Sequence, residues 1–253
     1  MRRIVVIGDV HGEQQRLARV LSWIADEPPA LALLVGDLAV DPPWRAPLRL
    51  RERGAHDRSV REVLARVRAA LGCPVLFVPG NHDLPDPDPA AVGTNCDGSV
   101  VDCAGLRVGG LGGAGPARFG FPYEWGERDA SAALAALSAA GERIDLLVCH
   151  APPHGSTLDR IHRGEHVGSR AVREWVVAAR PRLAVFGHIH EAWGLERLDG
   201  VPCLNAGALG EPFGEEIIWS VDWDERAGPL VVRSYHPAAG EFETRDWLGP
   251  DGR

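Results

Sequence analysis

The chain contains no lysine, and all 27 of its basic residues are arginine. This absence excludes a catalytic or Schiff-base lysine. It also excludes a Walker-type loop, whose lysine touches the nucleotide phosphates. Because arginine, alanine, glycine and proline are all abundant, we interpret the missing lysine as a compositional bias.

Basic residues are also outnumbered by acidic ones, 27 against 35, which gives a formal net charge of -8 at pH 7. Nucleic-acid backbones and anionic membranes are bound by basic faces. We therefore expect no extended nucleic-acid surface and no membrane partner. The oligomeric state is left open by the sequence.

Long apolar runs are missing as well, since no segment approaches the roughly 20 apolar residues that a membrane span needs. The chain opens directly in the strand-like stretch Met1–Ile7, without the apolar segment and cleavage site of a signal peptide.

The cysteines are odd in number and form no C-x-x-C pair: Cys73, Cys96, Cys103, Cys149 and Cys203. Free thiols in a reducing cytoplasm are the simplest interpretation, with a Cys96–Cys103 disulfide as the alternative.

Short apolar runs alternate with helical patterns over most of the chain. We expect core strands at Ile4–Ile7, Leu31–Val35, Val75–Val78, Ile144–Cys149 and Leu183–Phe186. Apolar residues that recur every 3.6 positions predict helices at Glu13–Ala25, Ser59–Leu71, Ala130–Ala140 and Ser169–Ala179. This alternation is typical of an α/β core, and the lack of a clear linker favours a single domain over residues 1–253.

The remaining segments are expected to form hairpins, turns and loops. Val100–Gly110 is typical of a hairpin that turns at Ala104-Gly105. Later strands are expected at Gly194–Leu198, Val201–Leu204, Glu216–Val221 and Leu230–Tyr235. Residues 41–47 and 84–98 are rich in proline, which favours loops.

Polar residues able to bind a metal follow each of the five expected core strands at its C-terminal end. In chain order they are Asp9, His11, Asp37, Asn81, His82, His150, His188 and His190. Open α/β sheets bind ligands in the crevice outside the carboxyl ends of their strands. The pattern therefore predicts that these side chains surround one crevice.

The chemistry of these side chains suits two divalent ions. Imidazole and carboxylate ligands favour manganese, iron and zinc, and we expect manganese first, with iron and zinc as alternatives. A carboxylate can bridge two ions about 3.5–4 Å apart, a spacing that serves phosphoryl chemistry. Taken singly, each piece is typical of a loop, a turn or a hydrogen-bonded histidine. All five pieces in order after buried strands favour a metal centre.

The ordered set Asp9-x-His11, Gly36-Asp37, Gly80-Asn81-His82-Asp83, His150 and Gly187-His188-x-His190 resembles the calcineurin-like metallophosphoesterase superfamily. The resemblance extends from Ile4 to about Leu209. Within it, residues 149–155, 166–169 and 180–191 are similar to small single-domain members and to the cyclic-nucleotide phosphodiesterase-like branch. The resemblance implies an α/β (α+β) fold, a four-layer αββα sandwich of two mixed β-sheets flanked by helices.

The resemblance also implies a role for each residue of the signature. A first metal is expected on Asp9, His11, Asp37 and His190. Asp37 would bridge to a second metal, completed by Asn81, His150 and His188. His82 is expected to act as general acid, or as a donor to the phosphoryl oxygens, and Asp83 to orient or charge His82. The implied reaction is in-line attack on phosphorus by a metal-bridging hydroxide, without a covalent intermediate.

Differences between this sequence and other branches of the superfamily narrow the range of expected substrates. The residues after Asp37 are Leu38 and Ala39, not the Asp-Arg-Gly run of the protein serine/threonine phosphatases, and Asp83 stands where those enzymes carry glutamate. A small phosphodiester such as a cyclic nucleotide is the leading substrate class. The alternatives are a phosphomonoesterase or nuclease of the same superfamily, a catalytically inactive metal-binding scaffold, and a two-metal hydrolase of other esters or amides.

Further residues near the expected crevice are candidates for substrate contacts. His154, His162 and His166 follow His150 and could line the pocket. Arg160, Arg163 and Arg170 in the same region could grip a phosphate or a nucleobase, and Trp193 and Phe213 could stack on a base. The simpler interpretation is that these residues are surface or packing residues, and that His56 and His236 are solvated.

Overall fold

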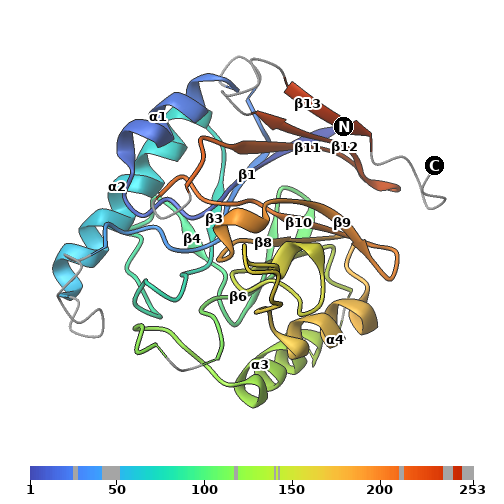
Figure 1. The fold of residues 1–253 in the computed structure, drawn as a ribbon. Helices are drawn as coiled ribbons and strands as arrows, with labels where there is room; N and C mark the ends of the chain where they lie inside the picture. The colour runs from blue at the N-terminus through green and yellow to red at the C-terminus, as the bar shows by residue number, and fades with distance from the viewer. Residues whose placement is uncertain are drawn as a thin grey trace.

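Two β-sheets form the centre of the computed structural model, which describes residues 1–24, 28–41, 52–116, 119–139, 141, 143–210, 214–235 and 242–246. In the described part of the chain, the first sheet runs in the order β13 (Phe242–Asp246), β12 (Gly228–Tyr235), β11 (Ile218–Asp224), β1 (Arg2–Ile7), β2 (Leu31–Leu34), β3 (Val75–Phe77), β4 (Thr94–Asn95). The second sheet runs in the order β5 (Val100–Cys103), β6 (Leu106–Leu111), β7 (Leu146–Cys149), β8 (Leu183–Phe186), β10 (Val201–Asn205), β9 (Gly194–Leu198). Figure 1 shows the two sheets with helices outside them.

Both sheets are mixed. In the first, β1, β2, β3 and β4 pair in parallel, whereas β11 pairs antiparallel with β1. In the second, β6, β7, β8 and β10 are parallel and the edge strands β5 and β9 are antiparallel. The parallel strands of each sheet therefore bring their carboxyl ends to one edge.

Helices cover the outer face of each sheet. Along β1, Ile4 and Val6 pack in the core between the sheets, while Val5 and Ile7 pack against α1 (Gln14–Ser22) and α2 (Arg53–Leu71). A strand that is buried on both faces explains the continuous apolar run in the sequence. Helices α3 (Glu127–Ala139) and α4 (Arg170–Ala179) cover the second sheet in the same way. The four-layer αββα sandwich is thus confirmed (Figure 1).

The expected core strands and helices are confirmed, with changes at their ends. Helix α2 begins at Arg53, six residues before the predicted start, because the Glu52 carboxylate accepts hydrogen bonds from the N–H groups of Gly54 and Ala55. This first turn lacks the apolar spacing that marks the rest of the helix, so the pattern did not include it. Ala25 and Ala140, the last residues of two expected helices, and residues 42–47 of the expected loop 41–47 lie outside the described residues.

The hairpin of β5 and β6 turns at Ala104-Gly105 as predicted. Two short strands were not predicted: β4, which lies within the expected loop 84–98, and β13. All five cysteines are unpaired, so the alternative Cys96–Cys103 disulfide is not formed. Within the described ranges, no helix is both long and apolar enough to cross a lipid bilayer.

Glycines at the strand ends allow the loops of the two sheets to approach each other. A Cβ at Gly36 would lie 2.3 Å from His150 Nδ1, and one at Gly80 would lie 2.0 Å from Asp37 Oδ1. A Cβ at Gly187 would lie 2.4 Å from Asp9 Oδ1. Any side chain at these positions would displace a polar group at the carboxyl edge of the sheets.

We predict that Gly80→Ala lowers the free energy of unfolding by about 1–3 kcal/mol, because the new Cβ overpacks against buried atoms. The contact includes the Asp37 backbone nitrogen at 2.3 Å, which cannot rotate away. Urea unfolding measures the change. Gly126→Ala is the matched control, since its Cβ would meet only Asp129 Oδ2, at 3.4 Å, among the described residues. Equal effects of the two changes would contradict this account.

Candidate metal centre

The eight predicted crevice residues lie together where the carboxyl ends of the two sheets meet. Strands β1, β2 and β3 of the first sheet are followed by Asp9, His11, Asp37, Asn81 and His82. Strands β7 and β8 of the second sheet are followed by His150, His188 and His190. Three overlapping clusters have candidate ligand atoms within 4.8 Å of one another: Asp9, His11, His190; His11, Asp37, His82; Asp9, Asp37, His150.

The first group of ligands surrounds Asp9. His190 Nε2 lies 3.2 Å from Asp9 Oδ2 and 3.4 Å from His11 Nε2. His11 Nε2 is in turn 3.8 Å from Asp37 Oδ2. The arrangement therefore matches the residues expected for a first metal, with Asp37 at its border.

The second group surrounds His150. Its Nε2 lies 3.5 Å from Asp37 Oδ2 and 2.9 Å from Asn81 Oδ1. The ring of His188 lies beside it, with 5.1 Å between ring centroids. Asp37 Oδ2 therefore lies within 4 Å of an imidazole of each group.

Two observations fit these residues to metal ions. Among the described side chains, Asp9 Oδ1 is a buried carboxylate oxygen without a hydrogen-bond partner, a costly arrangement unless a cation completes it. His150 Nδ1 donates to the Val35 carbonyl at 2.7 Å, which leaves Nε2 as the nitrogen for a ligand. The donor set of imidazole, carboxylate and amide oxygen suits first-row divalent ions.

Without a metal, the buried charges of the site perturb one another strongly. Burial alone would raise the pKa of Asp37, but His150, His82 and His11 lower it well below its ordinary value. Burial would lower the pKa of His150, but Asp37 and Asp9 raise it to about 9. For His188, burial and the adjacent His150 lower the pKa to about 3, so this imidazole is neutral at pH 7.

Backbone strain is concentrated at the same residues. His11, Asp37 and His188 have φ values of 47°, 48° and 69°, a left-handed conformation that non-glycine residues rarely adopt. Hydrogen bonds hold these turns: His11 N donates to Asp37 O at 2.7 Å, and His188 N donates to Asp9 Oδ2 at 2.8 Å. Strain of this kind persists where the surrounding structure holds a functional group in place.

His82 lies at the edge of the centre and is held by Asp41 and Phe121. The Asp41 carboxylate lies 3.0 Å from His82 Nδ1 and 2.9 Å from His11 Nδ1. The Phe121 ring stacks on His82 with 4.2 Å between centroids and 24° between planes. Burial would lower the pKa of His82, but Asp37 and the hydrogen bond to Asp41 raise it to about 9.

The carboxylate within hydrogen-bonding distance of His82 Nδ1 is that of Asp41, and the expected role of Asp83 toward His82 stays a prediction. Asp83 is fully buried, and its oxygens accept hydrogen bonds from the N–H groups of Leu38, Ala39 and Gly80. It therefore joins the loop that follows β2 to the loop that follows β3.

His56 was expected to be solvated, but it is 2% exposed, and its Nε2 lies 3.2 Å from Asp83 Oδ1. Burial alone would raise the pKa of Asp83, but the hydrogen bond with His56 leaves it lowered. Neither Asp41 nor His56 was predicted as part of the site. Asp41 is separated from Asp37 by only three residues, and this second carboxylate in the loop is the one signal that the sequence contained.

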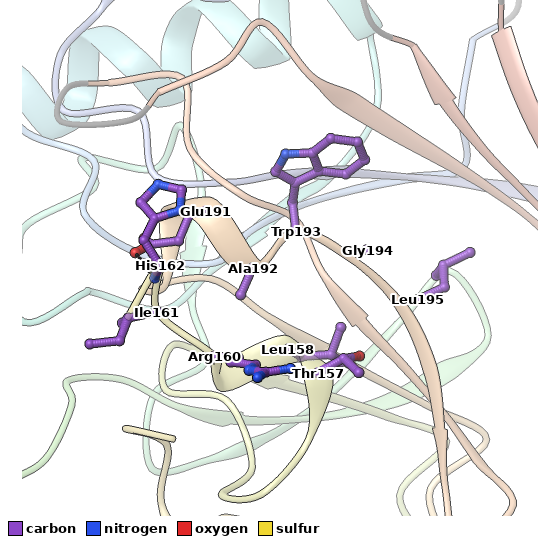
Figure 2. Close-up of a pocket in the computed structure, with 10 residues that line it drawn as sticks. All are labelled: Thr157, Leu158, Arg160, Ile161, His162, Glu191, Ala192, Trp193, Gly194 and Leu195. Atoms are coloured by element: carbon purple, nitrogen blue, oxygen red, sulfur yellow. Dashed lines mark hydrogen bonds between the residues drawn. The ribbon is translucent and has the colours of Figure 1, made fainter. Parts of the chain in front are cut away.

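The other candidate residues lie beside the centre. Arg160, His162 and Trp193 line a cavity whose lining also includes the residue after His190 (Figure 2). Arg163, Arg170 and His154 are not among its lining residues. His166 Nδ1 lies 2.6 Å from the buried Asp159 carboxylate. Phe213 and His236 lie outside the described residues.

The chain is similar to solved structures of low sequence identity, and the first of those named below shares its fold. The crystal structure of TT1561 of Thermus thermophilus is 18% identical, with a TM-score of 0.64 over 97% of this chain and 98% of that one. A novel archaeal phosphodiesterase is 12% identical, with a TM-score of 0.49 over 96% and 99%. YfcE, a phosphoesterase from E. coli, is 16% identical, with a TM-score of 0.48 over 97% and 100%. None of the curated proteins compared with the sequence matches it.

The family is shown by the sequence itself. The model of the calcineurin-like phosphoesterase family matches residues 2–192, a range that contains every candidate metal ligand described above. It also contains β1, β2, β3, β7 and β8, the strands that carry those ligands. Since the match covers most of the chain, the protein belongs to the calcineurin-like phosphoesterase family.

Proposed function

We propose that the protein is a metal-dependent phosphodiesterase acting on small substrates such as cyclic nucleotides. It would use two divalent ions, with manganese as the preferred metal. Membership of the phosphoesterase family supports the reaction class. The observation that carries the proposal is the buried Asp9 and Asp37 pair, ringed by imidazoles from both sheets, with Asp9 Oδ1 lacking a hydrogen-bond partner among the described residues.

The side chains of the centre would divide the work of holding the ions. Asp9, His11 and His190 would hold one, Asn81, His150 and His188 the other, and Asp37 would contact both. When bound, the ions supply Lewis acidity, which lowers the pKa of water and offsets negative charge on phosphoryl oxygens. The protein contributes a fixed, largely buried set of ligands that need little rearrangement.

His82 would donate a proton to the oxygen that leaves phosphorus. Its Nδ1 lies 3.0 Å from Asp41 Oδ1, which accepts a hydrogen bond there and leaves Nε2 to carry the transferred proton. Phe121 fixes the plane of the ring. The turn that carries Phe121 is itself held, because Glu124 accepts hydrogen bonds from the N–H groups of Phe119, Gly120 and Phe121.

The compartment that we propose is a reducing cytoplasm. The five cysteines are all unpaired, as expected for thiols that are kept reduced. Burial raises the pKa of Cys73 to about 11 and of Cys96 and Cys203 to about 12, so these thiols are unreactive.

The direct test is hydrolysis of bis(4-nitrophenyl) phosphate by protein loaded with Mn²⁺, followed by release of 4-nitrophenolate. We expect turnover that disappears after chelation and returns on adding the metal. 4-Nitrophenyl phosphate in parallel measures monoester hydrolysis. A rate no greater than that of Mn²⁺ alone on the diester would sink the proposal and favour a non-catalytic metal binder.

We predict that Asp37→Asn and His82→Ala separate metal binding from proton transfer. Both should reduce turnover by about 100-fold or more, since general acids contribute on the order of 10²–10⁴-fold. Only Asp37→Asn should lose metal, measured by elemental analysis, with Asp102→Asn as an exposed carboxylate control. Because His82 belongs to one of the three ligand clusters, equal metal loss in His82→Ala would make it a ligand instead.

We predict that Asp41→Asn lowers turnover by about 10–100-fold, the usual effect of losing a partner that orients a functional imidazole. A good leaving group needs less protonation than a poor one. The loss should therefore be larger for an alkyl phosphodiester than for the 4-nitrophenyl diester, in a kcat comparison at full metal loading. The same loss with both substrates would show that Asp41 does not act through His82.

A further inference from the structure

A cavity of ≈ 450 Å³ lies between the loop after β7 and the segment after β8, both of which also carry candidate metal ligands. It is lined by residues 157, 158 and 160–162, in the loop after β7, and by residues 191–195, which begin within the short helix His190–Ala192 (Figure 2). Glu191 lines the cavity and immediately follows the candidate ligand His190. The volume falls in the range of about 300–1,000 Å³ that is typical of small-ligand sites.

The two walls are held together by buried and polar contacts. The buried Asn205 donates from Nδ2 to the carbonyls of Leu158 and Ile189, at 2.9 and 3.0 Å. The N–H and hydroxyl of Thr157 both donate to Glu196 Oε2. His162 N donates to Glu191 Oε1 at 3.2 Å. A cavity fixed in this way needs little ordering when a ligand enters.

The lining suits a flat ring with polar edges. Leu158, Leu195 and Trp193 supply apolar and aromatic surface, whereas Glu191 and Arg160 supply one charge of each sign. The Glu191 carboxylate would repel a phosphate group, so the cavity suits a part of the substrate other than phosphate. Carboxylates accept hydrogen bonds from ring and amino N–H groups, and a guanidinium donates to ring nitrogens and carbonyls.

We propose that this cavity binds the nucleobase of the ester group that stays on phosphorus, with a preference for a base that presents N–H donors to Glu191, as guanine does. The inference rests on the proposed function, because it assigns the substrate class of the same centre. The leaving group would lie at His82, and the retained nucleoside would reach from His190 into the cavity.

Two diesters with one leaving group test the assignment: guanosine 5′-(4-nitrophenyl phosphate) and methyl 4-nitrophenyl phosphate. The wild-type protein, loaded with Mn²⁺, should show a kcat/KM about tenfold or more higher for the guanosine ester, through a lower KM, as expected for charged hydrogen bonds to a base. Glu191→Gln and Arg160→Ala should each remove most of this advantage. The fold loss of kcat/KM in both variants should be smaller for the methyl ester, which carries no base, than for the guanosine ester.

Matched controls are Glu165→Gln, in the same loop, and Arg128→Ala, on α3, both exposed and outside the cavity lining. Elemental analysis of Glu191→Gln checks that the neighbouring His190 still contributes to a loaded centre. Equal kcat/KM for the two esters in the wild-type protein would overturn the proposal, and so would an equal loss of the advantage in the controls.

Failure of the proposed function is recognised separately, because neither ester would then be hydrolysed. In that case saturation-transfer NMR with free guanosine decides the question without turnover. Binding to the wild-type protein that weakens about tenfold in Glu191→Gln and Arg160→Ala, but not in the controls, would sustain the cavity assignment. Lack of binding to the wild-type protein would overturn it.

Discussion

The buried carboxylates of Asp9 and Asp37 are the constraint on which the site depends. Both are essentially inaccessible to water, at 0% and 1% exposure, and a buried carboxylate is costly unless opposite charge and hydrogen bonds surround it. The protein supplies imidazoles from both sheets and backbone N–H groups from the turns, including His82 N to Asp37 Oδ1. One oxygen of Asp9 is left for a cation. The left-handed turns and the close glycines follow from the need to bring these groups to two carboxylates at once.

A second set of carboxylates holds the first in place. Asp83 accepts hydrogen bonds from the loops after β2 and β3 and so joins them. It also contacts His56 of α2. The Asp41 carboxylate contacts the rings of both His11 and His82. A candidate metal ligand and the proposed acid therefore share one hydrogen-bond partner. Loops usually move more than the strands that they connect. Here the hydrogen bonds of Asp83 and Asp41 hold the loops, as a preorganised site requires.

The segment after β8 serves two purposes in succession. Its first residues, Gly187 to His190, bring ligands to the metal centre, and the next five form one wall of the cavity. Asn205 on β10 holds this segment against the loop after β7. Phosphate chemistry and recognition of the organic group would therefore depend on one short stretch of backbone. Binding energy gained in the cavity would also orient the phosphate at the centre.

The sequence by itself predicted an α/β core and the set of Asp, Asn and His residues at its strand ends, and its family resemblance implied the αββα sandwich. Buried strands are visible as apolar runs, and residues that follow parallel strands must meet at one edge of the sheet. The first turn of α2 escaped prediction because a side-chain cap, not apolar spacing, starts it. Only the tertiary structure showed that Asp41 lies at the His82 ring and that His56 is buried. Asp41 and His82 are 41 residues apart in the chain, so their contact was not visible in the sequence. The cavity was likewise decided by tertiary structure, since its walls lie some thirty residues apart in the sequence and are joined by Asn205 from a third strand.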